Sequence, residues 1–220
     1  MEPVRWLLVV LAGCGRIGLD PMTDAADVHA SDAATIDAAA PITCPAGACA
    51  TSDTDFTLDQ GKGGWWYGAW DITDDADGIY EPSDFEMYAA MSGVWRPADW
   101  QPDPDPHFTW AYLAAWGGHP GSYPIRRADV RRWVSTGEGA AIVRVAHSKS
   151  DTSGGDGTRA MLVVDGQLLL VRDVAGDDGV GFVQDVPVVL HVGSTVDLLL
   201  HYISEDGSDT TNQTMTIVPP

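Results

Sequence analysis

The chain is a succession of short apolar runs separated by glycine- and aspartate-rich turns, with almost no helical periodicity. The runs are rich in β-branched and aromatic residues, which favour strands. Asp165-Gly166 lies between RAMLVV and QLLLVRDV, and such a two-residue connection is typical of a tight β-hairpin. The spacing predicts an all-β fold over residues 54–220, a single jelly-roll-like β-sandwich of about 8–10 antiparallel strands.

The first residues have the pattern of an export signal. MEPVRWLLVVLAGC places Arg5 before an apolar run that is too short for a membrane-spanning helix but long enough for a signal peptide. LAGC resembles the lipobox of bacterial lipoproteins. The resemblance implies a signal peptide over residues 1–13, lipidation of Cys14 (diacylglycerol plus an amide-linked acyl chain such as palmitate), and anchoring in the cell envelope. Gly15 is compatible with the outer membrane. A plain secretory signal with an incidental cysteine is the alternative.

Residues 14–53 differ in composition from the rest. Asp20 to Ala40 contain eight alanines and five aspartates, without any Phe, Trp, Tyr, Lys or Arg. Such a stretch cannot bury enough apolar surface to offset the entropy of ordering, so we predict a disordered tether. Near its end, Cys44 and Cys49 are predicted to form a small disulfide loop, because an exported compartment favours oxidation. A zinc site would need two more ligands, and none is close in sequence.

The charge balance excludes one class of partner. Thirty-two acidic residues against 12 lysines and arginines give a formal net charge of −20. Nucleic-acid binding requires a basic surface, so nucleic acid is not an expected partner. The same charge argues against electrostatic docking on anionic lipid. Neutral polymers and cations fit an acidic surface.

The stretch GGWWYGAWD concentrates aromatic side chains in one predicted strand. Trp65 and Tyr67 share one face of such a strand, whereas Trp66 and Trp70 flank Gly68 on the other. We expect one face in the core and the other near solvent, where the gap over Gly68 would form a slot for a sugar ring. The alternative is a close backbone approach at Gly68, with the outer rings covered by a loop.

Basic residues gather at positions 126, 127, 131 and 132. Because alternate residues of a strand face opposite ways, Arg131 or Arg132 must lie on the apolar side and needs a carboxylate there. The cluster is either a set of structural ion pairs or a site for an acidic sugar.

Five motifs in order, QGKGGWWYGAWD, WGGHPG, DVRRWVS, GGDGTRAMLVVDGQ and EDGSDTT, resemble a jelly-roll domain of secreted bacterial proteins that is akin to carbohydrate-binding modules. The resemblance implies an aromatic-rich face and a structural calcium ion. The candidate ligand-binding residues are Trp65, Trp66, Trp70, Trp116, His119 and Arg131, and the candidate calcium ligands are Asp206 and Asp209. Turn chemistry alone is the alternative for each Asp-Gly loop.

The sequence carries no HExxH zinc motif, no GxSxG nucleophile elbow and no spacing that pairs two carboxylates for glycoside hydrolysis. We therefore predict a non-catalytic envelope lipoprotein whose sandwich binds a polysaccharide or other glycan. An envelope module that binds a partner protein is the alternative, and a small polysaccharide lyase or hydrolase is a third, weaker candidate.

Overall fold

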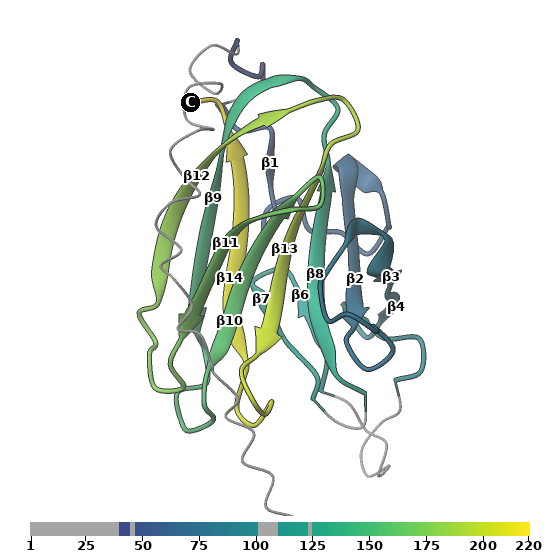
Figure 1. The fold of residues 1–220 in the computed structure, drawn as a ribbon, viewed down its shortest axis with the longest axis vertical. Helices are drawn as coiled ribbons and strands as arrows, with labels where there is room; N and C mark the ends of the chain where they lie inside the picture. Colours follow the sequence, from purple (N-terminus) through teal and green to yellow (C-terminus); the bar gives the residue numbers. More distant parts are fainter. Residues whose placement is uncertain (1–39, 45–46, 101–109, 123–124) are drawn as a thin grey trace, which may run out of the picture. The chain divides into compact units, whose positions relative to one another are not determined.

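The computed structural model describes residues 40–44, 47–100, 110–122 and 125–220 (Figure 1). In this part of the chain fourteen strands form two antiparallel sheets packed as a β-sandwich, which confirms the predicted fold class. There are more strands than expected because residues 85–119 contain five strands of only three residues each. Strands this short do not stand out as apolar runs. No helix of the described residues is long and apolar enough to cross a bilayer.

The eight-stranded sheet is built from both halves of the chain. Its strands are β1 (Ala50–Thr51), β4 (Ala89–Met91), β5 (Val94–Arg96), β6 (Tyr112–Ala114), β7 (Gly117–His119), β9 (Gly139–Lys149), β12 (Phe182–Leu190) and β14 (Thr211–Val218). Their order is β12-β9-β14-β7-β6-β5-β4, and β1 also pairs with β14. The long strands therefore occupy one side of this sheet, and the three-residue strands occupy the other.

The second sheet has six strands, β2 (Trp65–Asp71), β3 (Phe85–Met87), β8 (Arg127–Val134), β10 (Thr158–Val164), β11 (Gln167–Val174) and β13 (Thr195–Tyr202). Their order is β11-β10-β13-β8-β2-β3. Asp165 (φ 49°) and Gly166 (φ 82°) connect β10 to β11. Positive φ at both central residues is what a type I′ hairpin turn requires, so the predicted hairpin is confirmed.

The main core lies between the two sheets. Strand β9 shows the expected alternation, since Val143 and Val145 are fully buried and Arg144 between them is exposed. The eight-stranded sheet contributes Leu113, Met215 and Ile217 to this core in addition, and the six-stranded sheet contributes Trp65, Tyr67, Leu162 and Leu198. Burial of side chains of this size supplies most of the favourable free energy of folding.

A second apolar cluster covers the opposite face of the six-stranded sheet. Trp70, Tyr80, Val130 and Leu199 belong to it, and Ile72 and Phe85 pack against them. Residues 72–84, which follow β2, thus lie over the sheet. Strand β2 is buried on both faces, and this explains why its sequence is apolar on both.

Part of the predicted tether belongs to the folded unit. Pro41 forms a bridge with Ala140, Ile42 is buried, and β1 pairs with β14. The predicted disulfide between Cys44 and Cys49 is present. The folded unit therefore starts well before residue 54, whereas residues 1–39, with the predicted signal peptide and Cys14, lie outside the described residues.

We expect Gly68→Ala to destabilise the domain. A β-carbon at Gly68 would overlap the carbonyl oxygen of Glu86 and lie 2.8 Å from the ring of Phe85. Overpacking of this kind costs about 1–3 kcal/mol. Urea unfolding measures the loss. Gly207→Ala is the matched control, because its β-carbon meets only the Glu205 side chain at 3.7 Å. Equal stability of the two variants would contradict this packing.

Candidate functional site

The predicted slot between Trp66 and Trp70 is filled in the structure. Trp70 is only 4% exposed, and its Nε1 donates a hydrogen bond to Asp75 Oδ2 at 2.8 Å. The space over Gly68 is taken by the Phe85 ring and the Glu86 backbone. The prediction that this face lies near solvent is therefore wrong for Trp70. The covered arrangement is the one that the structure adopts.

The other two tryptophans of this stretch do not form a binding surface either. Trp65 is fully buried in the main core and stacks near Tyr67. Trp66 is partly buried, and its indole lies against Gly61, where a β-carbon would come within 2.8 Å of the ring. The side chains of strand β2 thus belong mainly to the apolar cores. Its three predicted ligand-binding residues, Trp65, Trp66 and Trp70, do not form a common surface.

Arg131 is fully buried between the sheets and cannot meet an external ligand. Its Nη2 donates hydrogen bonds to the carbonyl oxygens of Ala114 (2.5 Å) and Gly117 (2.6 Å). These two carbonyls flank the turn between β6 and β7. Burial lowers the pKa of Arg131 to about 10, which still leaves the guanidinium charged at neutral pH. Arg131 therefore fixes the β6–β7 hairpin from the core side of its sheet.

Asp129 lies two residues before Arg131 on the same face of β8 and is also fully buried. Its Oδ1 accepts a hydrogen bond of 2.5 Å from the Tyr88 hydroxyl. Burial raises the pKa of Asp129 well above its usual value, although Tyr88 and Arg131 oppose that shift. A β-carbon at Gly118 would lie 3.2 Å from Asp129 Oδ2, so this carboxylate touches the second strand of the hairpin.

The remaining arginines of the cluster have structural partners. Arg132 binds Asp197 through Nε (2.7 Å) and Nη2 (2.8 Å), and it lies over the Phe85 ring at 4.3 Å. Arg127 donates to Asp99 at 3.0 Å. The cluster is therefore built from ion pairs and carbonyl contacts, which is the structural alternative of the two that the sequence left open.

Exposed aromatic side chains gather instead on the outer face of the eight-stranded sheet. Leu113 of β6 points into the core, so its neighbour Tyr112 faces outward, as does His119 opposite Tyr112 in β7. Two indoles lie beside them, Trp110 (55% exposed) and Trp116 (43% exposed). We call Arg96, Trp110, Tyr112, Trp116 and His119 the Tyr112 cluster.

Ring contacts tie the cluster together. The centroid of Tyr112 lies 6.2 Å from that of Trp116, edge-on, and 6.2 Å from that of His119, stacked. The centroids of Trp110 and His119 are 6.1 Å apart. His119 is itself nearly buried, and its Nδ1 lies 2.7 Å from the carbonyl oxygen of Pro120. Burial lowers the pKa of His119, so this ring is a neutral support beneath the indoles.

Of the predicted ligand-binding residues, only Trp116 and His119 belong to this face, and only Trp116 is exposed. Trp110 and Tyr112 were missed. The signal was available in HFTWAYLAAW, where aromatic residues at alternate positions of a strand share one face.

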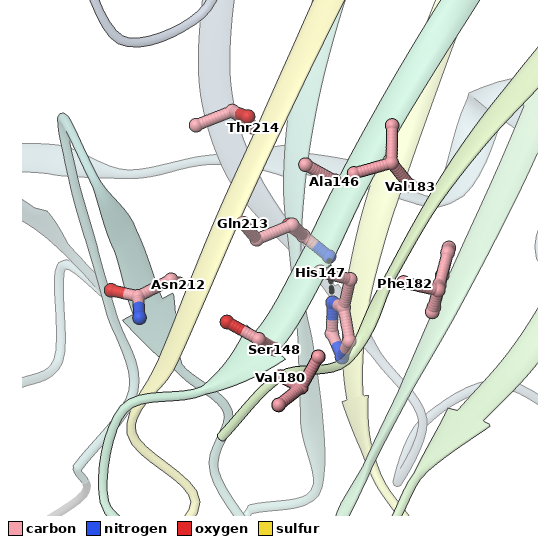
Figure 2. A pocket seen from close by; sticks show the side chains of 9 residues that line it. All are labelled: Ala146, His147, Ser148, Val180, Phe182, Val183, Asn212, Gln213 and Thr214. Atoms are coloured by element: carbon pink, nitrogen blue, oxygen red, sulfur yellow. Dashed lines mark hydrogen bonds between the residues drawn. The ribbon is translucent and has the colours of Figure 1, made fainter. Parts of the chain in front are cut away.

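A small pocket lies in the same sheet, and Figure 2 shows the side chains that line it. It has a volume of about 120 Å³ and is bordered by β9, β12 and β14. Asn212 sits between Ser148 and Gly117 in the strand register, and Gln213 N donates to Trp116 O at 3.0 Å. The pocket is thus next to the hairpin that carries Trp116. The lining residues are Ala146, His147, Ser148, Val180, Phe182, Val183, Asn212, Gln213 and Thr214.

The two predicted calcium ligands have other partners. Asp209 Oδ1 is 2.6 Å from Lys149 Nζ, and both side chains are fully buried. Asp206 accepts hydrogen bonds from the backbone N (2.8 Å) and Oγ (2.7 Å) of Ser122. No group of three histidine, cysteine or acidic side chains in the described ranges is arranged to hold a metal. The ammonium group of Lys149 thus lies where a cation beside Asp209 would be expected. The calcium ion stays a prediction that the positions of Asp206 and Asp209 do not support.

The comparisons with known proteins give distant likenesses. No protein-family model and no curated protein sequence matches the chain. A family 35 carbohydrate binding module from Clostridium thermocellum has a TM-score of 0.29 and 14% identity over 46% of this chain and 80% of that one. The CBM51-2 and INT domains of Clostridium perfringens ZmpB have a TM-score of 0.33 and 11% identity, over 81% of this chain and 30% of that one.

A β-glucosidase from Kluyveromyces marxianus is similarly distant, with a TM-score of 0.33 and 11% identity over 77% of this chain and 18% of that one. The matched region is therefore a minor part of the last two proteins. Similarity at this level says nothing about the site of this chain.

We expect Arg131→Met to destabilise the protein by about 3–5 kcal/mol, because the change leaves two buried carbonyls without a donor and removes the positive charge that favours the Asp129 carboxylate. Chemical denaturation measures the loss. Arg144→Met is the control, since Arg144 forms an exposed ion pair with Asp185, and such pairs contribute about 0–1 kcal/mol. A loss at Arg131 no larger than that of the control would refute its role in holding the hairpin.

Proposed function

We propose that this chain is a non-catalytic, lipid-anchored envelope protein that binds carbohydrate on the outer face of its eight-stranded sheet. The observation that carries the proposal is the pair of exposed indoles, Trp110 and Trp116, at a hairpin fixed from below by Arg131. Exposed tryptophans on a supported backbone favour ligand binding, because little side-chain entropy is lost when the ligand docks.

The chemistry of this face matches that of a sugar. The C–H face of a pyranose ring packs on an indole, whose π-electrons attract the partially positive hydrogens. Ser148, Asn212 and Thr214 line the adjacent pocket and supply hydroxyl and amide groups for sugar hydroxyls. With about 120 Å³, the pocket is smaller than typical ligand cavities of roughly 300–1,000 Å³. It suits a protruding group of a polymer that lies along the sheet.

The remaining parts of the proposal rest on the sequence. The lipobox LAGC supports anchoring through Cys14 in the envelope, with the outer membrane as the site that Gly15 allows. The lack of any catalytic motif in the sequence supports binding without turnover.

A partner protein is the second candidate, and one observation favours it. Leu168 and Val171 are exposed on β11, which is an edge strand of the six-stranded sheet. Exposed apolar edge strands are prone to pair with another chain. This edge is separate from the Tyr112 cluster, so the two functions are testable independently.

We expect Trp116→Ala to weaken glycan binding by about 1–3 kcal/mol, in analogy with other aromatic stacking contacts, while the fold is retained. A glycan array identifies the ligand, and calorimetry on wild type and variant measures the change.

Trp70→Ala is the contrasting variant. Its indole is buried in the second apolar cluster, so its truncation is expected to cost about 3–5 kcal/mol of stability. Unchanged glycan affinity in Trp116→Ala, with both proteins folded, would remove the outer face as the binding surface. Specific binding of an envelope protein without any glycan binding would favour the second candidate.

We expect Cys14→Ser to abolish membrane retention, because thioether formation needs the thiol. Metabolic labelling with palmitate and partitioning into detergent distinguish the two proteins. Partitioning of the wild type into the aqueous phase, together with the variant, would refute the lipid anchor.

A further inference from the structure

Arg96 and Arg172 differ from the other basic side chains of the described residues, because neither forms an ion pair or a hydrogen bond there. Arg172 is exposed, with its Cζ 4.5 Å from the ring centroid of Phe182, whereas Arg96 is partly buried. Six of the other side chains form ion pairs with carboxylates: Lys62, Arg127, Arg132, Arg144, Lys149 and Arg159. Arg126 and Arg131 donate to backbone carbonyls. Arg96 has neither kind of partner in the described ranges, although the chain carries 32 carboxylates. Its Nε and Nη1 are enclosed and lack any hydrogen-bond acceptor.

The position of Arg96 connects it to the proposed binding face. Its Cζ lies 4.6 Å from the ring centroid of Trp100 and 5.2 Å from that of Tyr112. Tyr112 in turn contacts the exposed Trp116. The two aromatic rings hold the guanidinium by cation–π contacts, which fix its place without neutralising its charge. Arg96 as a whole is partly exposed, and an acceptor that entered the cluster from the outer face would satisfy its unpaired donors.

We propose that Arg96 binds a carboxylate of the glycan, so that the preferred ligand carries a uronic acid or another carboxylated sugar. This inference rests on the proposed carbohydrate-binding function. Arginine is the side chain best suited to carboxylates, since its planar N–H groups give charge-assisted hydrogen bonds. A sugar ring stacked on Trp116 would direct its carboxylate past Tyr112 toward Arg96.

The net charge restricts the kind of acidic glycan. A chain with a formal charge of −20 repels a dense polyanion. At physiological ionic strength charges are screened beyond about 8 Å, so a single carboxylate beside Arg96 is little affected by distant acids. The ligand we infer is therefore an isolated or terminal acidic residue on a mostly neutral glycan.

The experiment compares uronic-acid-terminated oligosaccharides with their methyl esters, using calorimetry on the full mature chain. The esters keep the ring and remove the charge. We expect wild type to bind the acids at least tenfold more tightly than the esters. We expect Arg96→Gln to bind both equally, at the ester's affinity. Arg159→Gln is the matched control, because Arg159 is an exposed arginine on the other sheet, paired with Asp173. It should retain the preference, and thermal unfolding verifies that each variant is folded.

Each outcome separates the inference from the proposed function. Equal binding of acid and ester by wild type overturns the carboxylate assignment and leaves carbohydrate binding intact. An equal loss of acid and ester binding in Arg96→Gln also overturns it, since Arg96 would then only support Tyr112. Sulfated oligosaccharides that bind as tightly as the carboxylated ones would exclude carboxylate specificity. Failure of wild type to bind any glycan on an array overturns the proposed function itself.

Discussion

The buried pair Asp129 and Arg131 is the constraint on which the arrangement of the sandwich depends. Both side chains lie between the sheets, where charge is costly, and Arg131 Nε and Nη1 and Asp129 Oδ2 have no hydrogen-bond partner there. The pair is tolerated because Arg131 binds two carbonyls of the opposite sheet and Asp129 binds the Tyr88 hydroxyl. Strands β6 and β7 have three residues each and few ladder hydrogen bonds, so the arginine fixes a hairpin that its own sheet holds weakly.

The covering of the six-stranded sheet decides which surface is free to bind. Residues 72–84 place Tyr80 and Ile72 over Trp70. Arg132, which is paired with Asp197 on the sheet, holds this layer by donating to the carbonyl oxygen of Pro82. As a result, the aromatic side chains of β2 are divided between the main core, which contains Trp65 and Tyr67, and the second apolar cluster, which contains Trp70. The Tyr112 cluster lies on the other sheet, and its indoles remain exposed. The position of the covering segment thus places the proposed binding face on the eight-stranded sheet.

The few basic side chains of this acidic chain serve mostly as internal counter-ions. Lys149 illustrates this, because its ammonium group is fully buried against Asp209 and the carbonyl oxygen of Ser208. Burial raises the pKa of Asp209 to about 6 even so. The pair therefore joins the end of β9 to the segment before β14 more than it adds net stability. Arg96 and Arg172 are the exceptions in the described residues, since each lies over an aromatic ring and neither forms an ion pair or a hydrogen bond there.

Local chemistry in the sequence determined the fold class, the hairpin and the small disulfide. Asp165-Gly166 specifies its turn because both residues tolerate positive φ, and Cys44 and Cys49 are close enough in the chain to meet. Alternation correctly grouped Trp65 with Tyr67 and Trp66 with Trp70. It did not reveal what covers each face, because that depends on segments distant in the chain. Arg131 meets the carbonyls of a hairpin on the other sheet, and Lys149 meets an aspartate 60 residues later. Only the tertiary structure decided that Trp70 is core and Trp116 is surface, since burial is set by which elements pack together and not by the periodicity of any one strand.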